Sequence, residues 1–150
     1  MGPQSADEAA REFQRAVQEI AEDNSLGALA RLERALRSGD DRRWHSYLGY
    51  CIARERGQVR KGIDLCLSSL ELEPDNPEHY LNLGKVHLIS GNKDEALRVF
   101  REGMSRTGSA TLADLLERLG TRKPPVISFL SRDNLINRFL GLLLVRLGLR

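Results

Sequence analysis

Few residues of this 150-residue sequence have the type and spacing that catalysis or metal binding requires. Its histidines are His45, His79 and His87, and its two cysteines, Cys51 and Cys66, stand fifteen positions apart. A structural zinc site uses closely spaced pairs of cysteine and histidine, and that spacing is missing here. A cysteine nucleophile needs a base and an electropositive opening, whereas both cysteines fall on apolar stripes. We therefore expect two buried thiols and no metal site.

Nucleotide and acid–base chemistry also lack a suitable pattern. No glycine-rich phosphate-binding loop occurs, and the lone Gly84-Lys85 pair falls in the middle of a predicted helix. The acidic residues around Glu73 and Asp94 fit helix ends, where a carboxylate stabilises the helix dipole. The sequence therefore predicts a protein that is not an enzyme and uses no cofactor.

Composition and charge predict one ordinary globular body followed by a different tail. Apolar residues make up 41% of the sequence and charged residues 29%, which disfavours disorder, while 5% aromatic residues disfavour a β-sandwich. Two cysteines are too few for a disulfide framework, and the first residues lack the features of a secretory signal, so we expect a cytoplasmic protein. The net charge of +2 hides an uneven distribution, because residues 121–150 carry +5 and residues 1–120 carry −3.

Apolar residues recur at spacings of three and four along paired segments, as in amphipathic helices. The pairs cover residues 7–38, 42–73 and 77–106, and each is divided by a short polar or glycine-containing turn. A further apolar stripe over 109–120 predicts a capping helix. No stretch alternates with period two for long enough to form a strand, so we predict an all-α domain over residues 1–120.

The pairs also repeat. Leu48-Gly49 aligns with Leu83-Gly84 at a spacing of 35 residues. The segment with Tyr80, this second Leu-Gly pair, Ala96 and Phe100 closely resembles the tetratricopeptide repeat, a helix–turn–helix unit of about 34 residues. The chain resembles a small bacterial-type member of that family over residues 7–106, with a degenerate first repeat. The resemblance implies an α-solenoid of about three helix pairs, a capping helix and a C-terminal amphipathic helix.

Small residues at fixed places in each pair have a physical role in such a solenoid. We expect them to let the two helices of a pair approach closely, while large residues fill the space between pairs. These small residues are Ala28, Gly49, Gly62, Gly84 and Ala96.

The resemblance also implies a function, because proteins of this family bind other proteins along a concave surface lined by the first helix of each pair. Carried over through the Leu-Gly alignment, the predicted groove residues are Arg11, Gln14, Gln18, Arg43, Ser46, Tyr50, Arg54, Glu78, Leu81, Lys85 and Leu88. Together they would make a mildly basic groove that suits a peptide with acidic groups, although any one of them could be ordinary solvated surface. We therefore predict a scaffold or adaptor protein with a protein or peptide partner.

The tail, residues 121–150, begins with a proline-containing connector and continues into a predicted helix over about 133–149. Its predicted interaction face consists of Leu135, Phe139, Leu142, Leu143, Val145 and Leu149. Three interpretations stay open: the helix caps the repeats, it joins two copies or docks on a partner, or it lies on an anionic membrane surface. The last two define an alternative function, a peripheral membrane or oligomer-assembly factor. We expect no nucleic-acid partner, because the basic excess is confined to this leucine-rich segment.

Light scattering over a concentration series, on the full chain and on a chain ending at Gly120, distinguishes these interpretations. If the tail assembles the protein, the full chain is a dimer and the shortened chain is a soluble monomer. If the tail is a structural cap, the full chain is a monomer and the shortened chain aggregates or unfolds.

Overall fold

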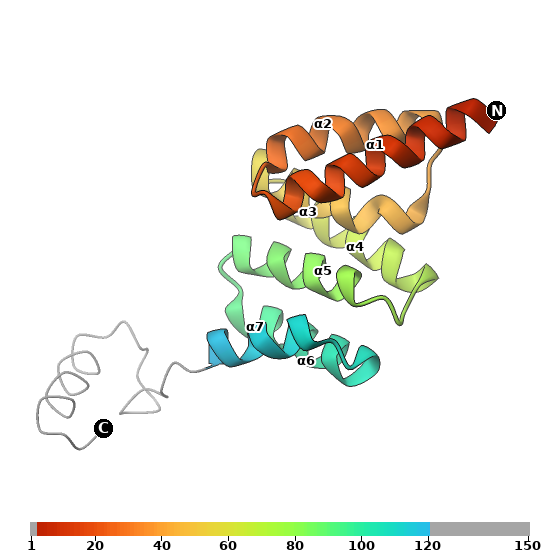
Figure 1. Ribbon diagram of the computed structural model, residues 1–150. Coiled ribbons are helices and arrows are strands. Elements are labelled where there is room, and N and C mark those ends of the chain that lie inside the picture. The colour runs from red at the N-terminus through yellow and green to blue at the C-terminus, as the bar shows by residue number, and fades with distance from the viewer. Residues whose placement is uncertain (1–2, 121–150) are drawn as a thin grey trace, which may run out of the picture. The chain divides into compact units, whose positions relative to one another are not determined.

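The computed structural model describes residues 3–120, and these form an all-α repeat fold (Figure 1). The elements in chain order are α1 (Pro3–Ala21), α2 (Ser25–Ser38), the short 3-10 helix η1 (Arg42–Trp44), α3 (His45–Arg56), α4 (Val59–Leu72), α5 (Pro77–Ile89), α6 (Lys93–Thr107) and α7 (Ala110–Gly120). The predicted fold class is confirmed for this part of the chain. The predicted tail helix and its interaction face lie outside the described residues.

Consecutive helices pack as pairs, α1 with α2, α3 with α4 and α5 with α6. The second pair joins its neighbours through α3, which packs against α2 and α5, while α5 also packs against α4 (Figure 1). None of the described helices combines the length and the apolarity that crossing a bilayer requires.

Asparagine side chains begin three of the helices. Asn24, Asn76 and Asn92 each precede a helix and accept a hydrogen bond from a backbone N–H of its first turn. This cap satisfies a donor that has no partner inside the helix. At the other end, Gly57 and Gly108 follow α3 and α6 with φ of +66°, the left-handed conformation in which glycine is least strained.

The small residues within the pairs do two different things. A Cβ on Gly49 would lie 2.5 Å from the Gly62 carbonyl oxygen, and one on Gly62 would lie 2.7 Å from the Gly49 carbonyl oxygen, so α3 and α4 touch backbone to backbone. Gly84 instead makes room for a ring, because a Cβ there would lie 2.0 Å from Phe100 Cε1. The expected close approach is therefore present, but in the third pair an aromatic side chain uses it.

The core continues from the third pair into α7. Leu112 of α7 is completely buried, and its Cδ1 lies 2.8 Å from where a Cβ on Gly103 would stand. The same position on Gly103 is 2.6 Å from the Cβ of Tyr80. Gly103 therefore lets helices α5, α6 and α7 approach one another closely.

Gly84→Ala should destabilise the protein even though alanine favours a helix by up to about 1 kcal/mol over glycine. Phe100 is completely buried, so its ring cannot move aside without overpacking the core, and we expect the free energy of unfolding to fall by about 1–3 kcal/mol. Urea denaturation measures the change. The control is Gly120→Ala, where the added Cβ meets no described atom within 4 Å. Equal stability of the two variants would contradict the packing at Gly84.

Candidate functional site

Three of the predicted groove residues, Tyr50, Arg54 and Lys85, meet where α3 faces α5. The Lys85 ammonium lies 5.1 Å from the centre of the Tyr50 ring, and Arg54 Nη1 donates to the Tyr50 hydroxyl oxygen over 2.7 Å. We call these three residues the basic cluster. Because Lys85 is half-buried, desolvation lowers its pKa, and the ring face provides a favourable but weak contact for its charge.

The predicted groove is less basic than its sequence suggests, because two of its four cations, Arg43 and Arg54, already have carboxylate partners. Arg54 Nη1 lies 2.6 Å from Asp23 Oδ1, in the turn between α1 and α2. Arg43 holds Asp41 with both its backbone N–H and its guanidinium group, whose Nη2 is 2.6 Å from Oδ2. Among the described residues, by contrast, no carboxylate lies within ion-pair distance of the Lys85 ammonium.

A second part of the site is a pocket of about 280 Å³ between α1, the start of α3 and the loop before α5. Its aromatic surface comes from Phe13, Trp44 and Tyr47. The Phe13 and Trp44 rings are stacked with their centres 4.7 Å apart, and the Tyr47 ring is edge-on to Phe13 with the two centres 5.1 Å apart. Ala10, Gln14, Arg43, Glu73 and Asn76 complete the lining. We call this the aromatic pocket, and of the predicted groove residues it contains Gln14 and Arg43.

The first pair needs a corrected register. Ala16 and Ala28 are completely buried and twelve residues apart, the same spacing that separates the buried small residues Gly84 and Ala96. With Ala16 equivalent to Gly84, the groove positions of α1 become Ala10, Phe13, Val17 and Ile20, whereas Arg11, Gln14 and Gln18 stand one position later. The last three are exposed, and Phe13, Val17 and Ile20 are half-buried. Without a Leu-Gly pair in this repeat, the sequence alignment was one residue out.

Ser46 is also corrected, because it has no exposed surface and cannot contact a ligand. Its hydroxyl group lies 2.8 Å from His79 Nδ1 and accepts from Asn82 Nδ2 over 3.2 Å. His79 Nε2 in turn lies 2.9 Å from Glu73 Oε2. A carboxylate can only accept, so Nε2–H donates to Glu73; in the neutral imidazole Nδ1 then accepts from the Ser46 hydroxyl. No sequence motif indicates this chain of bonds, which joins α3 to α5.

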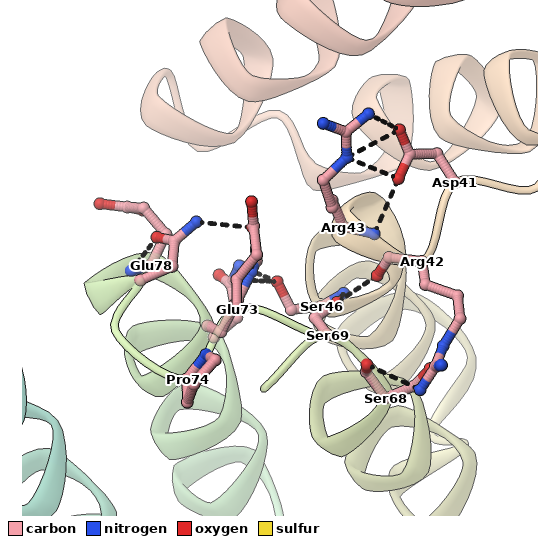
Figure 2. A network of polar contacts seen from close by, with 12 residues as sticks. Asp41, Arg42, Arg43, Ser46, Ser68, Ser69, Glu73, Pro74 and Glu78 are labelled. Atoms are coloured by element: carbon pink, nitrogen blue, oxygen red, sulfur yellow. Dashed lines mark hydrogen bonds and ion pairs between the residues drawn. The ribbon is translucent and has the colours of Figure 1, made fainter. Parts of the chain in front are cut away.

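The same network extends into η1 and α4, as Figure 2 shows. The Ser46 backbone N–H donates to the Ser69 hydroxyl over 2.9 Å, and Ser69 donates to the Arg42 carbonyl oxygen over 2.6 Å. The hydrogen bond from His79 is the main reason that the pKa of Glu73 is lowered, and a second bond, from Asn76, adds to it. Glu73 is therefore ionised at neutral pH. We call these bonded groups the junction network.

The order serine, histidine, carboxylate is also that of a nucleophile, a base and its orienting acid. In the junction network the serine hydroxyl has no access to a substrate, and a further donor, Asn82, already occupies it. The arrangement therefore holds two helix pairs together and does not present a nucleophile.

The two cysteines are buried and free, and burial raises the pKa of Cys51 to about 12 and that of Cys66 still further. At these values almost no thiolate forms at neutral pH, so neither sulfur is an activated nucleophile. Within residues 3–120, no three histidine, cysteine or acidic side chains gather closely enough to hold a metal ion.

The remaining predicted groove residues lie on α5. Glu78 is exposed, and Leu81 and Leu88 are half-buried. Together with Lys85, these residues line one face of α5, along which charged and apolar groups alternate. The rest of the basic cluster, Tyr50 and Arg54, lies on α3. This is a suitable composition for a protein-binding surface, whose contacts are commonly apolar at the centre and polar around it.

Stacked helix pairs, closed by a further helix, define the class of helical-repeat proteins. Residues 65–98, a window that runs from α4 through α5 into α6, match a family model described as Tetratricopeptide repeat. The match includes Leu83, Gly84 and Ala96, three of the residues on which the resemblance was based. The chain thus contains a tetratricopeptide repeat, and such repeats generally mediate interactions between proteins.

Ser46→Ala should destabilise the fold, because it leaves a buried histidine nitrogen and a buried amide without their partner. The expected loss is about 1–3 kcal/mol in the free energy of unfolding, measured by urea denaturation. Ser105→Ala, at an exposed position on α6, should change it by less than about 0.5 kcal/mol. A loss no larger than that of the control would show that the junction network does not stabilise the fold.

Proposed function

We propose that this protein is a non-enzymatic adaptor that binds a peptide or protein partner in the groove formed by α1, α3 and α5. The groove positions are Phe13, Val17 and Ile20 of α1, with Arg43, Tyr50, Arg54, Glu78, Leu81, Lys85 and Leu88 as the sequence alignment has them. Fixed helices present these side chains, so a ligand would bind with little ordering of the scaffold. The low cysteine content supports a cytoplasmic location.

The observation that carries the proposal is the state of Lys85. Its ammonium group is half-buried over Tyr50, and desolvation lowers its pKa more than the charges of Glu78 and Asp23 raise it, because no described carboxylate lies within ion-pair distance. Natural proteins rarely leave a desolvated charge without a partner, because doing so costs free energy. A carboxylate of a bound peptide, on a side chain or at the C-terminus, would remove that cost.

Apolar surface beside Lys85 supports a peptide ligand over a small anion. Leu81 and Leu88 are half-buried on the same helix, four and three residues from Lys85, so each retains area that a ligand could cover. Burying apolar area provides affinity, and the charge pair provides specificity and position. The partner we expect is therefore a segment with an acidic group next to apolar residues.

Selection from a library of random displayed peptides tests this function directly. Selected peptides are synthesised, and their affinities for the full chain and its variants are measured by calorimetry. Lys85→Met keeps most of the side-chain length and removes the charge, and we expect it to weaken binding about tenfold, the effect of losing a hydrogen bond to a charged group.

The matched control is Arg101→Met, which removes a positive charge from an exposed position on α6. We expect that variant to bind the selected peptides as the unchanged protein does. Failure to select any peptide, or equal affinity in all three proteins, would contradict a peptide-binding groove at Lys85.

The alternative, a membrane-associated or assembly factor, rests on the +5 charge and the apolar residues of the tail. These residues lie outside the described part of the chain. The light-scattering comparison given above tests the assembly form of this alternative.

A further inference from the structure

The aromatic pocket is a separate feature of the groove, and its size suits a single side chain. Its volume of about 280 Å³ is slightly below the roughly 300–1,000 Å³ of typical small-molecule sites. The half-buried rings of Phe13, Trp44 and Tyr47 give it an aromatic lining, and the polar groups of Gln14, Glu73 and Asn76 complete it. A long side chain with a polar end would therefore match both parts of the pocket.

The pocket contains a carboxylate oxygen that the protein itself leaves unused. Both hydrogen bonds to Glu73, from His79 and from Asn76, go to Oε2. Its Oε1 has no hydrogen-bond or ion-pair partner among the described residues, and 35% of the side chain is exposed. The junction network thus holds the carboxylate in one orientation and leaves its second oxygen available to a ligand.

The charge balance around this oxygen is negative. Arg43 lines the pocket and pairs with Asp41 through its backbone N–H, Nε and Nη2, so these two charges balance, while Arg43 still contributes to lowering the pKa of Glu73. Burial raises the pKa of Tyr47 to about 12, and the negative charges of Glu78 and Glu73 add to that rise. Two acids therefore act on this ring more strongly than any base does.

Aromatic faces and a carboxylate are together the surroundings that proteins use to bind cations. Arginine fits such surroundings better than lysine, because its planar guanidinium group stacks on rings and donates several hydrogen bonds to a carboxylate. An acidic or purely apolar side chain would give Glu73 Oε1 no hydrogen-bond donor.

We propose that the aromatic pocket binds an arginine side chain of the peptide, with Phe13, Trp44 and Tyr47 around its stem and Glu73 Oε1 at its guanidinium group. This inference rests on the proposed function and adds a second determinant to it. The groove would then have two zones of opposite preference, the basic cluster for an acidic group and the aromatic pocket for a basic one. A peptide with both charges would be held in one direction only.

The chain offers a built-in probe, because its single tryptophan, Trp44, lines the pocket. The full chain is titrated with N-acetyl-arginine amide while the Trp44 emission is recorded. One side chain supplies only a small part of a peptide's affinity, so we expect a saturable change with a dissociation constant on the order of 1–10 mM. N-acetyl-citrulline amide has nearly the same shape without the charge and should bind at least about five times more weakly.

Substitutions at Gln14 test the charge without disturbing the junction network, since this side chain is exposed and lines the pocket. Gln14→Glu should tighten binding of the arginine probe about two- to fivefold, and Gln14→Lys should weaken it by a similar factor. Gln58→Glu makes the same change in charge at an exposed position outside the pocket, and it should leave the affinity unchanged.

A non-saturable response, equal binding of the arginine and citrulline probes, or Gln14 variants that match the Gln58 control would each overturn the inference. These results are distinguishable from failure of the proposed function. If displayed peptides bind through Lys85 while the arginine probe fails, only the aromatic pocket is misassigned. If the arginine probe binds as expected and no peptide can be selected, the aromatic pocket is supported and the peptide-binding groove is contradicted.

Discussion

The buried chain of hydrogen bonds from Ser69 through Ser46 and His79 to Glu73 is the constraint on which the described arrangement of the second and third helix pairs depends. A buried donor or acceptor without a partner costs about 1–3 kcal/mol, so each member of the chain restricts the positions of the next. Apolar packing alone would tolerate small shifts between pairs, since contact between hydrocarbon surfaces is not directional. The junction network adds direction, and it does so where α3, α4 and α5 come together.

That constraint has consequences for the proposed binding surface. Glu73 belongs both to the junction network and to the aromatic pocket, so the group that fixes the helix pairs also sets the charge of the pocket. Tyr47 lies between these two features, edge-on to His79 at 6.4 Å and to Phe13 at 5.1 Å. The basic cluster is different, because no buried chain of hydrogen bonds holds it: helix packing buries the Tyr50 ring, Lys85 lies half-buried against that ring, and Arg54 pairs with the exposed Asp23. A binding surface with one rigid and one adaptable zone would accept variation in a ligand at Lys85 more easily than at Glu73.

Local patterns predicted much of this fold, while the site depended on pairings between distant residues. Helix periodicity and the Leu-Gly repeat are local, so the helix pairs and the small residues between them could be expected. The bond from Ser46 to His79 spans 33 positions, and neither residue type alone indicates it. Likewise, no local pattern indicates that Arg54 pairs with Asp23, which lies in another repeat. In the first pair the only local guide to the register of α1 is the Ala16–Ala28 spacing, which equals that of Gly84 and Ala96.

The two cysteines have an experimental consequence. Cys51 and Cys66 lie on the facing helices α3 and α4, both completely buried and with strongly raised pKa values. A thiol reagent can reach them only when this pair opens, because modification needs both access and a thiolate. Their rate of labelling in the native protein therefore measures how often the central pair separates. A third cysteine introduced on the surface would react far faster, so a dye can be attached there without replacing the native pair.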